Sequence, residues 1–207
     1  MAWGESKAWK KGTQNQALYQ ALLDDAMQAP ARNAKRKKVV HPEDMPWELS
    51  RHGLLKHLMN EGMNTRMETV DAYMLIIPPG SKSGKHRQLA EECLYVLEGR
   101  GYDLHQDYDV EITDTYHWAP QKEVKRYEWE AGDVAIVHMN CVHQHFNANP
   151  TKPARALVMK PKPMIMFMNM LFQKSVIPRP TEPTPEGKGF VPRHFEENHN
   201  YGDYEGA

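Results

Sequence analysis

Two segments of the chain, well separated in sequence, carry the residue types of a metal-binding site. The first contains His86, Gln88 and Glu92, and the second contains His143. His86 and Gln88 are two positions apart, so on a β-strand their side chains point to the same face, and Glu92 follows after a tight turn. Two imidazoles and a carboxylate from separate strands can meet at one point only if the sheet curls into a barrel. The pattern therefore constrains the fold as well as the chemistry.

Residues 68–160 have the texture of an all-β domain. Short runs of β-forming residues alternate there with glycine and proline, which is typical of an antiparallel sandwich or barrel. The candidate strands are Val70–Ile77, His86–Leu89, Leu94–Leu97, Gly101–Gln106, Lys125–Trp129, Val134–Val137, Val142–Asn147 and Arg155–Met159. The segment at residues 107–123 is polar and aromatic, and we expect it to form an inserted hairpin or loop beside the mouth of the barrel.

Residues 1–67 are expected to form an N-terminal helix and a connector that packs on the barrel. Thr13 and Gln16 have the spacing of a capping box, and an apolar stripe follows them. Pro30 is expected to end this helix, because proline removes a backbone donor and clashes with the preceding turn.

Residues 161–207 are expected to form a proline-rich, partly disordered C-terminal extension that lies as an extended arm. One short element is predicted near residues 164–174, where methionines occupy alternate positions from Met164 to Met170. This alternation indicates a strand or an apolar interface. Packing between two copies of the chain is the simplest account, because methionine fills irregular contacts well.

Charge and cysteine content exclude several classes of protein. The 26 basic and 27 acidic residues nearly cancel, so no overall field favours nucleic acid or an anionic membrane as a partner. Two cysteines, Cys93 and Cys141, are too few for a disulfide framework. The N-terminus has no apolar signal-like run, and the longest apolar run, residues 163–172, is too short to span a bilayer. We therefore expect a soluble, cytoplasmic, single-domain protein with appended arms.

The ligand types of the candidate metal site favour iron. Two neutral imidazoles and one carboxylate, from His86, His143 and Glu92, form the facial set that suits non-heme Fe(II) and leaves positions open for substrate and O₂. Mn, Ni, Cu and Zn stay open as alternatives. Gln88 offers either a weak amide-oxygen ligand or a hydrogen bond to a bound water.

The spacing of these residues resembles the first motif of the cupin superfamily. That motif has five fixed positions, and four are matched by Gly80, His86, Glu92 and Gly99. Gln88 takes the place of the second histidine. The phrase at residues 95–101 is also typical of cupins.

The second cupin motif is matched at three positions, by Gly132, His143 and Asn147, while His138 and Asn140 stand where proline and glycine are usual. The resemblance covers residues 68–160. It implies a jelly-roll barrel, also called a double-stranded β-helix, with an N-terminal helical arm and an extended C-terminal arm. Asn147 is expected to make structural hydrogen bonds at the end of its strand.

Within the superfamily, the chain is similar to small ring-cleaving dioxygenases of the gentisate and salicylate type, on the residues His86-Arg87, the phrase at 95–101 and the run 143–147. Such enzymes are expected to hold iron with three histidines, so Gln88 puts the ligand set in question. His145 lies on the same strand face as His143 and either supplies the missing imidazole or serves as acid or base. We favour the second role, because the cupin pattern already assigns the ligand positions. His138, at the turn before that strand, is a further acid–base candidate.

These inferences together predict an iron-dependent cupin dioxygenase that uses O₂ on a small aromatic or enolic substrate. We expect a homodimer or a higher homo-oligomer, with neither nucleic acid nor membrane as a partner. Two alternatives remain. One is a redox-neutral lyase, decarboxylase or isomerase, in which the metal acts as a Lewis acid. The other is a cupin that binds a small molecule without catalysis, because a fold does not fix a function.

Overall fold

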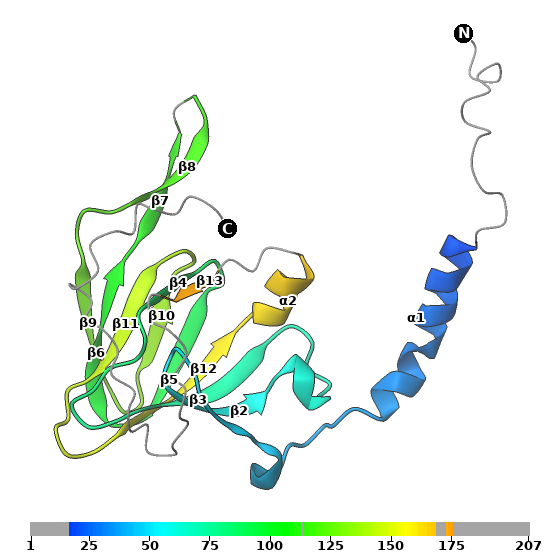
Figure 1. Ribbon diagram of the computed structural model, residues 1–207, viewed down its shortest axis with the longest axis horizontal. Helices are drawn as coiled ribbons and strands as arrows, with labels where there is room; N and C mark the ends of the chain where they lie inside the picture. Colours follow the sequence, from blue (N-terminus) through cyan, green and yellow to red (C-terminus); the bar gives the residue numbers. More distant parts are fainter. Residues whose placement is uncertain (1–16, 113, 169–172, 176–207) are drawn as a thin grey trace. The chain divides into compact units, whose positions relative to one another are not determined.

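The computed structural model describes residues 17–112, 114–168 and 173–175 (Figure 1). The chain divides into two compact units, residues 1–36 and residues 37–207. The first unit contains one helix, α1 (Leu18–Ala34). The second contains the strands and the remaining helices.

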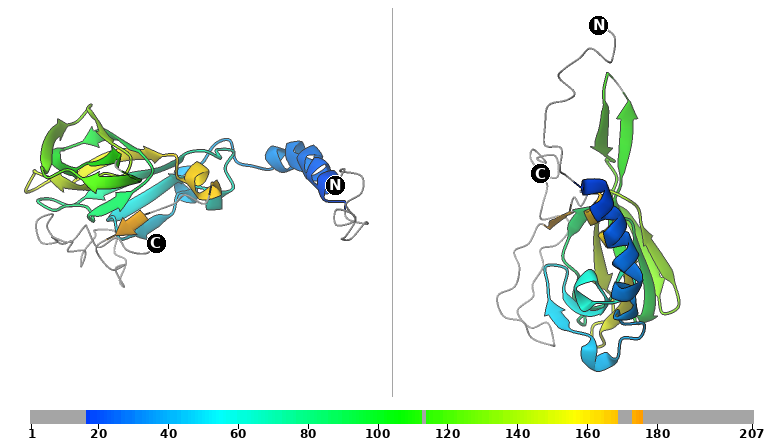
Figure 2. Two further views of the ribbon diagram at one scale, coloured as in Figure 1. Left: turned by 90° about the horizontal axis from the view of Figure 1, so that it is seen from above. Right: turned by 90° about the vertical axis from the view of Figure 1, so that its right-hand side faces the viewer.

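Two antiparallel sheets form the second unit and face each other (Figure 2). The six-stranded sheet has the order β1 (Trp47–Leu49), β2 (Leu54–Met59), β3 (Asp71–Ile77), β12 (Ala154–Lys160), β5 (Glu92–Glu98) and β10 (Val134–Val137). The five-stranded sheet has the order β13 (Gln173–Ser175), β4 (His86–Gln88), β11 (Val142–Asn147), β6 (Arg100–Gln106) and β9 (Lys125–Glu130). This arrangement is a jelly-roll barrel, and the all-β prediction is confirmed.

Buried and more exposed residues alternate along the strands, and the buried ones form the core between the two sheets. In β12, every second residue from Ala154 to Lys160 is buried. The main apolar cluster includes Leu75, Leu94 and Val158, all almost fully buried. Sequence patterns located these strands well, because each of the eight predicted runs coincides with a strand of the barrel to within about two residues.

The predicted insertion is a hairpin of β7 (Tyr108–Ile112) and β8 (Tyr116–Pro120). It projects beyond the two sheets in Figure 1. Two 3₁₀ helices, η3 (Pro42–Asp44) and η4 (Glu61–Met63), and a short helix, α2 (Lys162–Phe167), complete the described elements. No helix among the described residues is both long and apolar enough to cross a bilayer.

One motif glycine has a clear structural reason. Gly99, in the tight turn between β5 and β6, has a φ of 98°, a conformation that residues with a side chain rarely adopt. A Cβ atom at this position would also lie 2.9 Å from the Cα of Ala154 on β12. Glycine is therefore the residue that lets the turn close against the neighbouring strand.

The structure corrects two local predictions. Helix α1 continues through Pro30 to Ala34, because a proline removes one hydrogen bond of the ladder while later bonds still form. The predicted capping residues Thr13 and Gln16 lie outside the described residues. The methionine-rich segment begins as helix α2 and not as a strand, since a proline in the first helical turn favours helix.

Strands from both sides of residues 68–160 pair with strands of the barrel. Strands β1 and β2, from the predicted connector, extend the six-stranded sheet before residue 68. Strand β13, from the predicted C-terminal extension, pairs with β4. Residues 176–207, where the extended arm was predicted, lie outside the described residues.

Candidate metal centre

His86, Glu92 and His143 meet between the two sheets. Each offers a ligand atom, and these atoms all lie within 4.8 Å of one another. His86 on β4 pairs in register with His143 on β11, and their ring centroids are 4.1 Å apart. Glu92 begins β5 in the opposite sheet. All three side chains are buried, so the fold brings together the triad that the sequence predicted.

Backbone carbonyls fix the orientation of both imidazoles. His86 Nδ1 lies 3.0 Å from the carbonyl oxygen of Gly84, and His143 Nδ1 lies 3.1 Å from that of Cys141. Because a carbonyl oxygen only accepts, each Nδ1 donates and each Nε2 keeps its lone pair. Both Nε2 atoms are buried and have no hydrogen-bond partner among the described residues. Carbonyl-oriented imidazoles of this kind are usual for metal ligands, and the donor set fits a divalent ion.

The surroundings of the triad favour the protonation states that a metal needs. It lowers the pKa of His143 to about 3 and that of His86 well below its usual value. Burial alone would raise the pKa of Glu92, but the Lys160 ammonium and the His145 imidazole outweigh it and hold that pKa well below its usual value. The triad therefore consists of two neutral imidazoles and one carboxylate.

Both polar atoms of the Gln88 amide contact neighbouring side chains. Its Nε2 donates to Glu92 Oε2 at 3.0 Å, and its Oε1 accepts from Lys160 Nζ at 3.2 Å. Lys160 also donates to Glu92 Oε2 at 3.2 Å. The place of the second cupin histidine is thus part of a network around Glu92, in which a lysine from β12 participates.

His145 lies between two carboxylates. Its Nδ1 donates to Asp103 Oδ1 at 2.9 Å, and its Nε2 lies 3.4 Å from Glu92 Oε1. Burial would lower the pKa of His145, but Asp103 and Glu92 raise it to about 10. Asp103 also accepts from Trp129 Nε1 at 2.7 Å and is fully buried. His145 can therefore hold a proton beside Glu92, which suits an acid–base group.

His138 lies apart from the triad. Its side chain is exposed, and its Nδ1 donates to the carbonyl of Met139. It lines a cavity of about 600 Å³ together with His105 and Asp107. Asn147 has the expected structural role, since its amide donates to the carbonyls of Ile77, Pro78 and Lys152.

Sequence reasoning missed His52. It lies in the turn between β1 and β2, and its ring centroid is 4.1 Å from that of His86. The backbone amide of Gly84 donates to the His52 carbonyl at 2.9 Å and ties the turn to the start of β4. Burial, then Lys160, lowers the pKa of His52 to about 3, so the ring is neutral. No spacing pattern marks His52, because only the barrel brings this turn to the triad.

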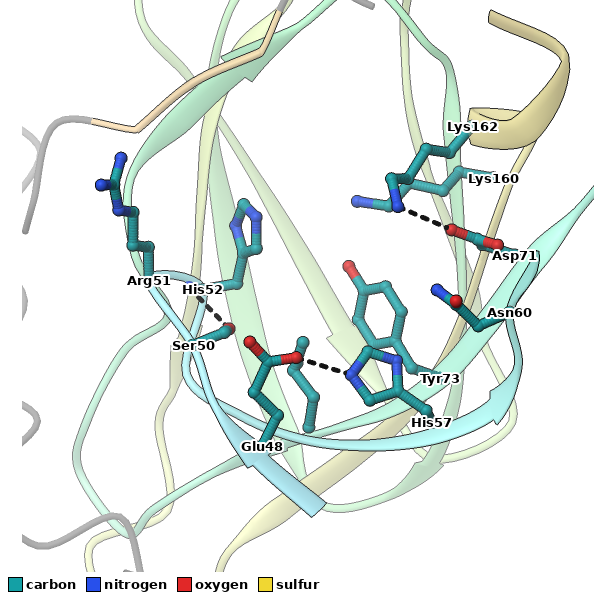
Figure 3. Close-up of a pocket in the computed structure, with 11 residues that line it drawn as sticks. Glu48, Ser50, Arg51, His52, His57, Asn60, Asp71, Tyr73, Lys160 and Lys162 are labelled. Atoms are coloured by element: carbon teal, nitrogen blue, oxygen red, sulfur yellow. Dashed lines mark hydrogen bonds and ion pairs between the residues drawn. The ribbon is translucent and has the colours of Figure 1, made fainter. Parts of the chain in front are cut away.

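A cavity of about 370 Å³ lies beside His52 and Lys160. Figure 3 shows His52, Tyr73 and Lys160 directed into it, with the Tyr73 hydroxyl near its centre. Tyr73 comes from β3 and Lys160 from β12. Because His52 contacts His86 and Lys160 contacts Glu92, this cavity adjoins the candidate metal centre.

Comparison with known families agrees with the fold. The sequence profile of the family described as auxin binding protein matches residues 31–181. The comparison with curated proteins gives no match.

Solved structures of similar fold include an oxalate decarboxylase from Lactobacillus farciminis, at 16% identity and a TM-score of 0.49, covering 66% of this chain and 35% of that one. They also include the salicylate 1,2-dioxygenase from Pseudoaminobacter salicylatoxidans, at 12% identity and a TM-score of 0.46, covering 76% and 35%. A vicilin from tomato, Solanum lycopersicum, has 15% identity and a TM-score of 0.45, covering 58% and 31%. The chain thus spans about a third of the length of these proteins.

Proposed function

The chain belongs to the auxin binding protein family and has the cupin fold, and from this premise we propose that it is a metal-dependent oxygenase. In this proposal His86, Glu92 and His143 hold a divalent metal, Fe(II) before Mn, Ni, Cu or Zn. The substrates are O₂ and a small aromatic or enolic molecule admitted through the cavity beside His52.

One observation carries the proposal. The Nε2 atoms of His86 and His143 are buried, keep their lone pairs and lie with Glu92 in one cluster. A buried polar atom without a partner is costly, and a bound cation would satisfy both nitrogens and the carboxylate together. A three-residue ligand set leaves positions on the metal for substrate, as in non-heme iron oxygenases.

When bound, Fe(II) supplies the electron transfer that lets O₂ react with an organic molecule. The residues of the chain do the remaining work. Lys160 and Gln88 orient the Glu92 carboxylate by hydrogen bonds. His145, oriented by Asp103, holds a proton that it can give to a developing anion or recover from a substrate hydroxyl. Its buried place in the barrel keeps this proton away from bulk water.

The cavity beside His52 favours a small acidic substrate. Arg51, Lys160 and Lys162 line it. Lys160 already pairs with Glu92 and Lys162 with Asp71, so Arg51 is the cation that a carboxylate or phenolate would meet there. Asp71 and Glu48 also line the cavity, and they are engaged by Lys162 and His57 respectively. Tyr73 offers a hydroxyl for orientation, and burial, with Glu92, raises its pKa, so that the hydroxyl stays protonated.

A second candidate function is capture of a small molecule without turnover. The match to a family of auxin binding proteins favours it. The same cavity and metal would bind the small molecule, which would then be released unchanged.

Metal analysis coupled to O₂ uptake tests the proposal. Protein purified without oxygen should contain Fe(II), and Glu92→Ala and His86→Ala should lose it. The wild-type protein should consume O₂ with at least one catechol, gentisate, salicylate or hydroxyketone. Binding of these molecules without O₂ uptake would favour the second function, and turnover without O₂ uptake would indicate a redox-neutral enzyme. Absence of any bound metal in the wild type would overturn both proposals.

We further propose that the chain forms a homo-oligomer by binding a second copy of itself. The outer face of β5 and β10 carries exposed apolar side chains, Tyr95, Leu97, Val134 and Ile136. Val134 pairs with Tyr95 in register, so these groups form one patch at the edge of the six-stranded sheet. Patches of this kind on a sheet edge are typical of contacts between subunits. The free thiols of Cys93 and Cys141 fit the proposed cytoplasmic location.

A further inference from the structure

We propose a second metal site in the barrel, formed by His105, Asp107 and Cys141, that takes a divalent ion of the zinc class. Each residue offers one ligand atom, and these atoms all lie within 4.8 Å of one another. The set differs in chemistry from the His86, Glu92 and His143 triad, because it includes a sulfur donor.

Strand register builds this cluster. β6 runs from Arg100 to Gln106, and His105 points into the barrel on the same face as Asp103. Val142 on β11 pairs with Gln106 on β6. The next residues outward from this pair are Cys141 and Asp107, which are therefore neighbours at the end of the two strands.

The donor atoms are available for a cation. His105 and Cys141 are buried, and Asp107 is half-buried. His105 Nε2 has no hydrogen-bond partner among the described residues and lies 3.6 Å from Asp103 Oδ2. The Cys141 thiol donates a weak hydrogen bond to the carbonyl of its neighbour Val142 at 3.3 Å. Imidazole, carboxylate and thiolate are the three ligand types that zinc uses in proteins.

A catalytic cysteine is the other reading of a Cys–His–Asp cluster, and electrostatics opposes it. Burial, followed by the nearby Asp107 carboxylate, raises the pKa of the Cys141 thiol. A nucleophilic cysteine needs the opposite shift, whereas a metal displaces the thiol proton itself on binding. The same carboxylate that suppresses the thiolate would then serve as a ligand.

The site has its own access from solvent. The cavity of about 600 Å³ is lined by His105 and Asp107, with His138 also on its wall. It is distinct from the cavity beside His52, which has no lining residue in common with it. This space allows a metal to enter and a water to complete its coordination.

The two sites are adjacent but use different atoms. The ring centroids of His105 and His143 are 6.1 Å apart. Cys141 uses its backbone carbonyl to orient His143, and its side chain belongs to the second cluster. A change of the Cys141 side chain therefore removes a ligand of the second site and leaves the carbonyl that orients His143.

Cobalt titration of the full chain tests the proposal, because a thiolate bound to Co²⁺ gives an intense near-ultraviolet charge-transfer band that nitrogen and oxygen ligands do not give. The wild-type protein should bind a second equivalent of Co²⁺ with this band. Cys141→Ser should lose the band and no longer bind the second equivalent of Co²⁺. Asp107→Asn should lower the affinity for this second Co²⁺ ion by about 10-fold or more. Cys93→Ser is the matched control, because Cys93 is the other cysteine and lies on β5 outside both clusters; it should keep the band.

The outcomes separate this site from the first. Glu92→Ala should lose one equivalent of Co²⁺ and keep the charge-transfer band, so a failure of the first site would not hide the second. A wild-type protein without the band, or a band that survives in Cys141→Ser, would overturn the proposal. Circular dichroism of each variant identifies any that fails to fold, and Asp107→Asn, at a half-buried position, then gives the decisive titration.

Discussion

Lys160 holds its ammonium 3.2 Å from Glu92 Oε2, inside the barrel and almost fully buried. The contact joins the last residue of β12 to the first residue of β5 and places a positive charge next to the one carboxylate of the candidate metal centre. Burial alone would lower the pKa of Lys160, but Tyr73 and Glu92 raise it above its usual value. A bound cation would therefore share Glu92 with a fixed ammonium group.

This relationship predicts that Lys160→Met destabilises the apoprotein more than the metal-loaded protein. Loss of one partner of a buried ion pair leaves the other charge uncompensated and costs about 3–5 kcal/mol. A bound metal would compensate the charge of Glu92 in place of the lysine, so the free energy of unfolding should fall clearly less in the metal-loaded protein. Urea unfolding with and without added metal measures both values. Lys162→Met is the matched control, because it breaks an ion pair with Asp71 that does not involve the metal ligands, and it should lose the same stability with and without metal. Equal losses for Lys160→Met in both conditions would contradict the prediction.

Gln88→Ala is expected to keep the metal. The Gln88 amide contacts Glu92 and Lys160, so it orients a ligand and does not need to be one. Removal of such a supporting contact typically weakens metal affinity by about 10–100-fold. Competition with a chelator measures this change. Gln106→Ala, whose amide donates to the carbonyl of Gln121, serves as the control, and a loss of metal as complete as in His86→Ala would identify Gln88 as a ligand.

His145→Ala is expected to keep the metal and lose most of the activity. His145 contacts Asp103 and Glu92, and a positioned acid or base contributes about 10²–10⁴-fold to a rate. Metal content and kcat from O₂ uptake, measured on the same preparation, check both parts. His117→Ala, in the exposed β7–β8 hairpin, should change neither. Loss of metal in His145→Ala would instead assign this residue to the ligand set.

Much of the fold was predictable because its signals are local. Alternation of apolar residues marks each strand wherever one face is buried, and Gly99 marks a turn that only glycine fits. The triad of His86, Glu92 and His143 was likewise predictable, since strand periodicity and the two cupin motifs fix its spacing. The helix at residues 162–167 was missed, because alternating methionines satisfy both a strand and a short exposed helix.

The surroundings of the triad could not be predicted, because they depend on strand order. His52 reaches His86 from a turn that precedes the cupin motifs in sequence, and the residues next to it in the sequence form no pattern that predicts this contact. Lys160 lies at the end of a strand where an exposed lysine is the normal expectation, and it is buried because β12 and β5 are neighbours. Asp103 has no distinguishing feature in the sequence, and its role follows from the pairing of β6 with β11, which places His145 opposite it.

Asn147→Ala is expected to destabilise the fold by about 2–3 kcal/mol. The Asn147 amide donates to the carbonyls of Ile77, Pro78 and Lys152, at 3.0, 3.1 and 2.8 Å, and so ties three parts of the chain together at the end of β11. Removal would leave buried carbonyl groups without partners, which costs about 1–3 kcal/mol for each unsatisfied group. Chemical unfolding measures the difference. Asn149→Ala, which removes an acceptor that lies in an exposed turn, should cost under about 1 kcal/mol, and equal effects of the two changes would contradict the assigned role of Asn147.

Ile136→Lys is expected to dissociate the proposed homodimer. Ile136 is 71% exposed on β10, beside Val134 and Tyr95, so in a single copy of the chain these neighbouring apolar side chains face water. A lysine there would be buried without a partner in an interface between two copies, which costs several kcal/mol in each subunit. Sedimentation velocity measures the change in mass. Ile112→Lys, at a position of similar exposure (70%) on the β7–β8 hairpin, is the matched control and should keep the wild-type mass. A wild-type protein that sediments as a monomer would contradict the proposed homodimer. An Ile136→Lys variant that stays dimeric would show that the two copies contact each other through another surface.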